Sequence, residues 1–210
     1  MNPKLKNALE WTYCIVIAII IALAVKYFIG TPTVVRQTSM NNTLQEGERL
    51  WLNRWHRTVN GEYEVGDIIT FEAPSEIYPS LMEINFDYPV AKYEYEPKGL
   101  LKKFAYYILE TTKTSYIKRV IGVEGDYIKI ENGKVYRNGE ELQENYLAEG
   151  VITKSKTYSD ITVPEDCVFV MGDNREHSID SRDFGCIPIS KVESKVAFRF
   201  WPLNKFGKIE

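Results

Sequence analysis

The sequence has few of the residues that build metal sites and disulfide frameworks. Its 210 residues include three cysteines and two histidines, and no Cys-x-x-Cys motif. His56 and His177 are far apart in the chain, which argues against a zinc site, and we expect neither a metal ion nor another cofactor. An odd number of cysteines does not describe a disulfide framework. Cys167 and Cys186 can pair if they face an oxidising compartment, but two buried free thiols are the simpler interpretation.

The chain also lacks a block of basic residues. Lys and Arg number 26 against 29 Asp and Glu, a net charge of −3, so no electrostatic feature favours nucleic acid as a partner. Charged residues make up 26% and apolar residues 44%, as in ordinary globular proteins, which argues against disorder, collagen and coiled coil. This length is enough for one core with a small appendage.

One long apolar run lies near the N-terminus. Residues 11–29 contain a single charge, Lys26, and aromatic residues lie at both ends. About 20 apolar residues span a bilayer, and Lys26 is near enough to the end for its ammonium to reach the interface. The run therefore predicts an uncleaved transmembrane anchor. A cleaved signal peptide is the alternative, but no A-x-A-like cleavage site follows the run.

The charges around the run indicate an orientation. Lys4 and Lys6 precede it and favour a cytoplasmic N-terminus, although other charges nearby weaken this argument. We therefore expect a single-pass protein of the cell membrane. Its parts are a cytoplasmic tail at 1–10, a transmembrane helix at 11–29 and an extracytoplasmic domain at 30–210.

The remainder of the chain is typical of a mainly β domain. Short β-prone runs alternate with Gly, Asn and Pro. The strand candidates are residues 33–35, 49–52, 67–71, 127–130, 134–136, 167–171 and 196–201. The pair Asn132-Gly133 favours a tight hairpin turn, because both residue types accept the positive φ that such a turn needs.

Residues 75–115 interrupt this pattern and are interpreted as an insertion. The part at 75–97 is aromatic and broken by proline, which predicts irregular structure. In 99–112 the apolar residues recur at helical spacing, which predicts a helix. We expect this helix to pack on the β domain; the alternative is a helix that lies in the membrane interface.

Three polar stretches are candidates for chemistry, at residues 38–44, 116–126 and 172–185. Each has an ordinary structural interpretation when taken alone. The first offers a turn hydroxyl, the second an exposed strand lysine, and the third a turn whose side chains bond their own backbone.

Together the stretches are more specific. Lys118 lies in a segment that is apolar on both flanks. If it points inward, desolvation lowers its pKa, and a neutral amine can act as a base near neutral pH. A serine hydroxyl such as that of Ser39 requires a base of this kind. The third stretch would then supply the hydroxyls and the ion pair that orient the lysine amine.

The order of the motifs resembles that of bacterial type I signal peptidases, or leader peptidases, which are membrane-anchored serine proteases with a Ser–Lys dyad. The matching motifs are Ser-Met-x-x-Thr, Tyr-Ile-Lys-Arg-Val-x-Gly-x-x-Gly-Asp and Gly-Asp-Asn-Arg-x-x-Ser-x-Asp-Ser-Arg-x-Phe-Gly. The resemblance extends from the anchor to about Trp201, and one anchor is typical of the short Gram-positive-type members. It implies a β-rich catalytic domain that removes signal peptides from secreted preproteins at the lipid bilayer.

The resemblance also implies roles for individual residues. Ser39 matches the nucleophile and Lys118 the general base. Ser178 matches the serine that hydrogen-bonds the lysine amine. Asp180 and Arg182 match a structural ion pair.

Further expectations concern the surroundings of this pair. Arg119 follows the base, as is usual in the family. The resemblance implies that the backbone N–H of Ser39 is one oxyanion donor, and that the second belongs to Gln37, two residues earlier. Candidates for shallow apolar pockets that hold small substrate side chains at −1 and −3 flank the catalytic positions: Val34, Val35, Met40, Leu44, Tyr116 and Ile117.

Two positions depart from the family pattern. Asn42 replaces a proline behind the nucleophile. Because proline fixes φ near −65°, we expect Asn42 to give looser positioning rather than loss of activity. Glu124 replaces a proline in a loop, which is a smaller change.

Two other functions stay open at this point. One is a serine hydrolase that uses His177 or His56 with an aspartate. The other is a membrane-tethered β domain that only binds partners. The sequence does not predict an oligomeric state.

Overall fold

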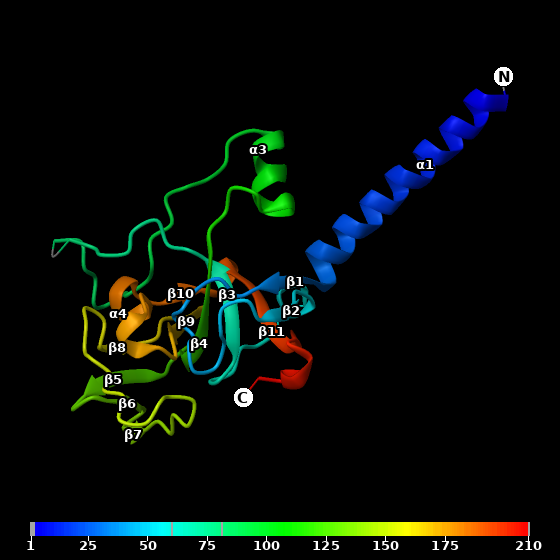
Figure 1. The fold of residues 1–210 in the computed structure, drawn as a ribbon. Helices are drawn as coiled ribbons and strands as arrows, with labels where there is room; N and C mark the ends of the chain where they lie inside the picture. Colours follow the sequence, from blue (N-terminus) through cyan, green and yellow to red (C-terminus); the bar gives the residue numbers. More distant parts are fainter. Residues whose placement is uncertain (1–2, 60, 81, 210) are drawn as a thin grey trace.

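The computed structural model describes residues 3–59, 61–80 and 82–209, and its N-terminal helix projects from a β-rich domain (Figure 1). Helix α1, Pro3–Ala24, continues as the π-helical turn η1, Val25–Ile29. Its apolar part, Lys6–Ile29, is long and apolar enough to cross a membrane, and none of its apolar window is buried in the molecule. This helix includes the whole apolar run on which the anchor prediction rests.

The last turn of this helix is bonded to the domain by the short helix α2, Trp55–Thr58, and by Arg54, the residue that precedes it. Carbonyl groups at the end of a helix have no donor within the helix. Here the Arg54 N–H donates to Ile29 O at 3.0 Å, and the Arg57 guanidinium donates to Tyr27 O at 3.1 Å. The helix therefore leaves the domain through a bonded joint rather than a free linker.

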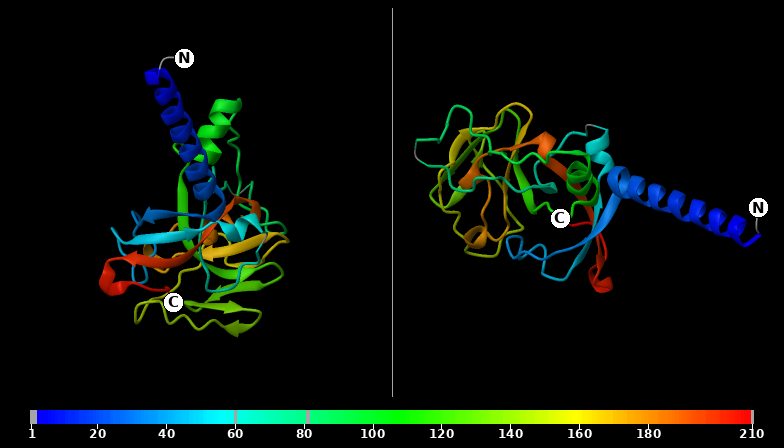
Figure 2. Two further views of the ribbon diagram at one scale, coloured as in Figure 1. Left: turned by 90° about the vertical axis from the view of Figure 1, so that its right-hand side faces the viewer. Right: turned by 90° about the horizontal axis from the view of Figure 1, so that it is seen from above.

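Seven antiparallel strands form the larger sheet, in the order β1-β2-β11-β3-β4-β9-β10. Strand β1 begins at Gly30, the residue that ends the N-terminal helix. The strands are β1 Gly30–Val34, β2 Arg49–Asn53, β3 Ile68–Glu72, β4 Ser115–Val123, β9 Cys167–Met171, β10 Ile187–Pro188 and β11 Val192–Trp201. Figure 2 shows this sheet from two further directions.

A smaller sheet has the order β7-β6-β5-β8. Its strands are β5 Tyr127–Glu131, β6 Lys134–Arg137, β7 Glu140–Glu141 and β8 Asp160–Thr162. The turn between β5 and β6 has φ of 53° at Asn132 and 81° at Gly133, the positive values from which the hairpin was predicted. The prediction of a mainly β domain behind an apolar helix is confirmed.

One apolar cluster joins the two sheets. It combines Ile121 of β4 and Phe169 of β9 with Ile128 of β5, and all three are fully buried. The same cluster contains Cys167 and Cys186, which are free, buried thiols. Burial raises the pKa of the Cys167 thiol to about 11, as expected for an unreactive core cysteine.

Four short helical turns complete the domain: η3 Arg175–His177, α4 Ser181–Phe184, η4 Ile189–Lys191 and η5 Leu203–Lys205. The sequence did not predict these turns or the short strands β7, β8 and β10. Elements of two to four residues are too short to show a periodic pattern.

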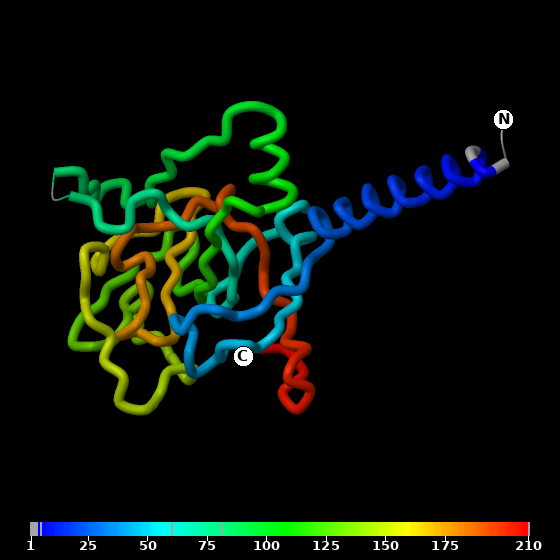
Figure 3. The backbone as a smooth tube through the Cα atoms, turned by 45° about the horizontal axis from the view of Figure 1, so that its top comes forward, coloured from blue at the N-terminus to red at the C-terminus, as the bar shows by residue number. Residues whose placement is uncertain are grey.

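The insertion arches over one side of the domain (Figure 3). The described residues of 75–97 form no helix and no strand beyond an isolated bridge from Val90 to Cys186. Helix α3, Leu100–Phe104, and the turn η2, Ala105–Leu109, follow. The predicted helix is therefore confirmed.

Packing of that helix on the β domain is not confirmed. Among residues 100–109 only Tyr106 is buried, while Leu100 is 87% exposed and Leu101 85% exposed. Figure 1 shows α3 standing clear of both sheets. The helical spacing creates an apolar face, but no part of the described chain covers it.

Candidate active site

Ser39 and Lys118 lie in contact, although 78 residues separate them in the sequence. Ser39 is in the turn that follows β1, and Lys118 is in β4. The Lys118 Nζ donates to Ser39 Oγ at 2.7 Å and to Ile117 O at 3.1 Å. Both side chains are buried, with 8% of Ser39 and 2% of Lys118 exposed.

Burial changes the acid–base chemistry of this lysine. Desolvation lowers the pKa of Lys118 from 10.5 to about 8, against the opposing charges of Asp180 and Asp173, while Arg182 lowers it further. Desolvation has this effect because it disfavours the charged form of an amine. A fraction of Lys118 is therefore neutral near physiological pH, and that form can accept a proton from Ser39.

The loop after β9 holds the turn that carries Ser39. The Asn174 N–H donates to Ser39 O at 3.0 Å, and the Asn174 side-chain amide donates to Thr38 O at 3.1 Å. Gly172 lies so close that an added Cβ would be 2.5 Å from Ser39 O and would overlap the Ser178 hydroxyl. The other two residues of this Gly-Asp-Asn-Arg motif form ion pairs: Asp173 with Arg119, and Arg175 with Glu144.

Asp180 and Arg182 form the predicted ion pair, and neither side chain is exposed. The Arg182 Nε and Nη2 donate to the carboxylate, each at 2.8 Å, and the Gly172 N–H donates to it at 3.1 Å. Burial acts to raise the pKa of Asp180, but the Arg182 hydrogen bonds and charge outweigh it and hold that pKa below its usual value. The pair stays charged and fixes the loop behind Lys118.

Ser178 is buried beside Gly172, close to the dyad. Among the described residues it makes no hydrogen bond to the Lys118 amine, which bonds Ser39 and Ile117 instead. The contact from Ser178 to Lys118 therefore stays a prediction from the resemblance.

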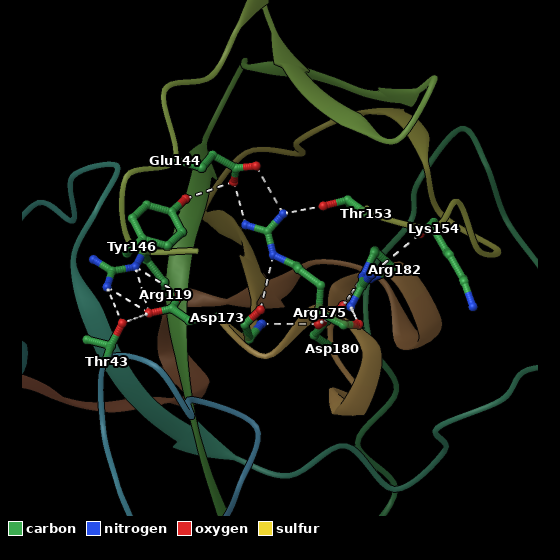
Figure 4. Close-up of polar contacts among 11 residues, drawn as sticks. Thr43, Arg119, Glu144, Tyr146, Thr153, Lys154, Asp173, Arg175, Asp180 and Arg182 are labelled. Carbon is green, nitrogen blue, oxygen red and sulfur yellow. Dashed lines mark hydrogen bonds and ion pairs between the residues drawn. The ribbon is translucent and has the colours of Figure 1, made fainter. Parts of the chain in front are cut away.

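Arg119, the residue after the lysine, joins the two motifs (Figure 4). Its Nε and Nη2 donate to the Asp173 carboxylate at 3.0 and 2.8 Å, and Thr43 donates to the same carboxylate at 2.5 Å. The guanidinium also lies 4.0 Å from the centre of the Tyr146 ring. Asp173 thus connects β4, the nucleophile turn and the loop after β9.

A second buried ion pair joins Arg175 to Glu144 (Figure 4). The Arg175 Nη1 also donates to Thr153 at 2.7 Å, and Nε donates to Gly172 O at 3.1 Å. Sequence reasoning assigned no role to Asp173 or Arg175. The available signal was their position in a polar run that directly follows the apolar strand β9.

A cleft of 690 Å³ is lined by residues next to the dyad, although neither Ser39 nor Lys118 lines it. Its lining includes Gln37 and Ile117, which are close to Ser39 and Lys118 in the sequence, and also Lys26, Arg54 and Glu110. Four of the predicted substrate-binding residues also line it: Val34, Val35, Tyr116 and Ile117.

Met40 and Leu44 are not in the cleft. Neither side chain is exposed, because both pack with Leu50 in the apolar cluster beneath the nucleophile turn. They can support the turn, but they do not face a substrate. The sequence showed that these residues are apolar and near Ser39, but not on which side of the chain they lie.

The backbone at Asn42 differs from what a proline would allow. Its φ is 94°, whereas proline holds φ near −65°. Glu124, the other departure, accepts a hydrogen bond from the Asp166 N–H at 2.9 Å, which joins two surface loops.

The two histidines lie outside the dyad. His177 is exposed in η3, and His56 contacts Glu62 O at 2.8 Å. Among the described residues, no hydrogen bond joins either ring to Ser39 or to an aspartate. A Ser–His–Asp arrangement is therefore not favoured.

Comparison with known proteins agrees with this geometry. The family described as "Signal peptidase, peptidase S26" matches residues 8–201. Signal peptidase I of Bacillus licheniformis is 32% identical over 98% of this chain and 95% of its own length. Signal peptidase IB of Staphylococcus aureus is 31% identical over 96% of this chain and 93% of its own.

A crystal structure of a signal peptidase I from Enterococcus faecalis V583 covers 64% of this chain and 96% of its own, with a TM-score of 0.41 and 23% identity. The family match and the curated relatives span nearly the whole chain, including all three motifs. The chain belongs to the signal peptidase family, peptidase S26.

Proposed function

We propose that this protein is a membrane-bound serine endopeptidase that removes N-terminal signal peptides from exported preproteins, with Ser39 as nucleophile and Lys118 as general base. Family membership supports the reaction. The buried contact of 2.7 Å between Lys118 Nζ and Ser39 Oγ is the observation that carries the assignment of residues, because a general base must lie within hydrogen-bond reach of the proton it accepts.

The first half of the reaction forms an acyl-enzyme. Neutral Lys118 accepts the Ser39 hydroxyl proton while Ser39 Oγ bonds to the carbonyl carbon of the last signal-peptide residue. The tetrahedral intermediate then expels the amine of the mature protein, which takes the proton from the Lys118 ammonium. The signal peptide remains as an ester on Ser39.

The second half repeats the proton transfers with water. Lys118 accepts a proton from a water molecule that attacks the ester carbonyl. The tetrahedral intermediate expels Ser39 Oγ, which regains a proton from Lys118, and the signal peptide leaves with a free carboxylate.

The oxyanion requires donors aimed at the position where negative charge develops. We assign one to the backbone N–H of Ser39. Gln37 lines the cleft, which supports its side chain or backbone as the second donor. Loss of one such donor typically costs about 2.7–4 kcal/mol of transition-state stabilisation.

The cleft suits an extended peptide. Its walls include the edge strand β1 and the start of β4, so a substrate can add a strand whose main chain pairs with the enzyme. We assign Val34, Val35, Tyr116 and Ile117 to shallow pockets for small side chains at −1 and −3.

We further propose that α1 and η1 span the cell membrane, with the tail before the apolar run in the cytoplasm and the domain from residue 30 outside. Lys4 and Lys6 support this orientation. The lining of the cleft includes Lys26, at the base of the helix, where a membrane-inserted signal peptide would emerge.

Replacement of the dyad tests the catalytic assignment. Ser39→Ala and Lys118→Met are each expected to abolish cleavage of a preprotein by the purified full chain, with unchanged circular dichroism. The matched control is His177→Ala, which should keep full activity. Retained cleavage in either dyad variant overturns the assignment, and activity lost only in the histidine variant favours the histidine hydrolase. Absence of cleavage by the parent chain favours a tethered binding domain.

A further inference from the structure

The helix of the insertion exposes several large apolar side chains on one face. Leu100 and Leu101 are 87% and 85% exposed, and Phe104, one turn later, is 44% exposed. Soluble domains seldom leave neighbouring large apolar side chains this open unless another surface covers them. No part of the described chain does so.

This helix is fixed in place by contacts on its other face. The Tyr106 hydroxyl donates to the buried Glu72 carboxylate at 2.7 Å, and its ring lies 5.3 Å from that of Tyr95. The exposed leucines are therefore not at the tip of a free loop. They are presented by a helix whose opposite face is bonded to the domain.

A second set of contacts ties the helix to the N-terminal anchor. The Lys26 ammonium, near the end of the anchor, donates to Ile108 O at 3.3 Å and to Leu109 O at 3.0 Å. It also pairs with Glu110 at 3.5 Å, and Arg54 donates to the same carboxylate at 2.8 Å. These carbonyls belong to the last turn of η2, so Lys26 satisfies the end of one helix from the side of another.

The contacts of Lys26 with η2 fix the position of the exposed leucines relative to the end of the N-terminal apolar helix. The base of η2 is bonded at Lys26, close to the end of the apolar run of α1 and η1, and α3 rises from there on the side from which α1 leaves the domain (Figure 2, left). If α1 crosses a membrane, its end at Lys26 lies near the lipid surface, and the tip of α3 reaches beyond it towards lipid.

The surroundings of the tip suit the lipid interface. Lys98, Lys102 and Lys103 are exposed on or beside α3, and lysines near a membrane surface attract anionic headgroups. Trp55 of α2 is 53% exposed beside the joint with the anchor, and tryptophan is a preferred interfacial side chain. Basic side chains thus flank the apolar tip, and an exposed aromatic side chain lies at the joint with the anchor.

We propose that Leu100, Leu101 and Phe104 insert into the lipid surface beside the anchor, so that α3 is a second, monotopic membrane contact of the catalytic domain. The inference rests on the proposed transmembrane role of α1. Two attachments at different points would stop the domain from turning about the anchor and would hold the cleft entrance, which Lys26 and Glu110 line, against the membrane.

Quenching of a fluorescent probe by nitroxide-labelled lipid tests this proposal in the full chain. An environment-sensitive fluorophore is attached in Leu101→Cys in a Cys14→Ser background, and the protein is reconstituted in phosphatidylcholine–phosphatidylglycerol vesicles with the nitroxide near the headgroup. Cys167 and Cys186 are buried and stay unlabelled. We expect the probe to lose roughly half of its emission, as interfacial helices bury about 5–10 Å of their apolar face.

The matched control is Ile152→Cys in the same background. Ile152 is also exposed, at 63%, but it lies against Gly133 in the turn between β5 and β6, at the end of the domain opposite α3 (Figure 1). Its probe is expected to keep its emission. Hydrolysis of a soluble signal-peptide-derived peptide verifies that each labelled chain is folded.

A probe on the native Cys14 separates this inference from the proposal it rests on. Cys14 lies exposed within α1, so quenching by a nitroxide deep in the acyl chain reports that α1 is inserted. If the Cys14 probe is quenched and the Leu101→Cys probe is not, the second contact is overturned and the anchor stands. If the Cys14 probe is not quenched, the anchor fails and the second contact fails with it. Equal quenching of the Leu101→Cys and Ile152→Cys probes also overturns the proposal, because it would indicate adsorption without orientation.

Discussion

The chemistry of Lys118 depends on burial of one ammonium group. With a pKa of about 8, the residue is mostly protonated at neutral pH, and only the neutral form accepts the Ser39 proton. We therefore expect kcat/KM for a soluble peptide to rise about tenfold per pH unit below pH 8 and to level off above it. A pH–rate profile of the free enzyme measures this directly. A profile that is flat from neutral to alkaline pH would contradict the proposed base.

The backbone conformation of Asn42, in the turn that carries Ser39, leads to a second prediction. Asn42 has a φ of 94°, which asparagine and glycine tolerate but proline cannot adopt. Asn42→Pro is expected to reduce peptide hydrolysis by about tenfold or more, because the turn must change and Ser39 moves with it. Asn42→Gly is the matched control and should keep activity near that of the parent. Full activity in the proline variant would show that the turn accepts a second conformation.

The role of a single residue was predictable from the sequence where its chemistry is rare. It was not predictable where the role depends on which way the side chain points. Ser39 and Lys118 were chosen from motif type, and the structure brings them within 2.7 Å. Met40 and Leu44 were placed in the substrate pockets, but they are core residues. Apolar residues beside a catalytic serine serve either purpose, and an irregular turn gives no period that separates its two sides.

At the scale of elements, the length of each helix or strand decided whether the sequence could predict it. The longer strands and the hairpin at Asn132-Gly133 carried a pattern, whereas β8, β10 and α4 have two to four residues and depend on tertiary contacts. The helical spacing predicted α3 correctly. The same spacing does not distinguish a helix that packs on protein from one that contacts lipid, because both surfaces are apolar.

The ion pair between Arg175 and Glu144 links the small sheet to the loop after β9. Glu144 follows β7, and Arg175 begins η3 with none of its side chain exposed. Glu144→Ala leaves a buried guanidinium without its carboxylate, so we expect the free energy of unfolding to fall by about 3 kcal/mol. Urea denaturation of the full chain in detergent micelles measures this loss.

The matched control is the ion pair of Glu141 with Lys134, whose side chains are 42% and 54% exposed. Glu141→Ala removes a solvated pair and should cost less than about 1 kcal/mol. Equal losses in the two variants would mean that the Arg175 pair contributes no more than a surface contact. A large loss for Glu144→Ala alone supports its role in holding the loop that carries Asp173 and Asn174.

At the scale of the whole molecule, the anchor and the cleft form one unit. The chain passes from η1 into β1 at Gly30 without a linker, and Lys26 both lines the cleft and bonds η2. Under the proposed topology, a signal peptide that leaves the bilayer beside the anchor would meet the cleft at its entrance. The position of the domain relative to the N-terminal helix is set by bonded contacts rather than by the length of a tether.

A short Gly-Ser insertion between Ile29 and Gly30 would break that unit without a change in the dyad. It displaces the hydrogen bond from the Arg54 N–H to Ile29 O and lets the cleft shift relative to the end of the anchor. The effective concentration of a membrane-inserted preprotein at the cleft therefore falls. We expect its cleavage in vesicles to drop by about tenfold, while hydrolysis of a soluble peptide stays unchanged. The same insertion between Glu149 and Gly150, in an exposed loop, should change neither rate. Equal loss on both substrates would indicate a damaged domain, and undiminished preprotein cleavage would show that the bonded joint does not guide the substrate.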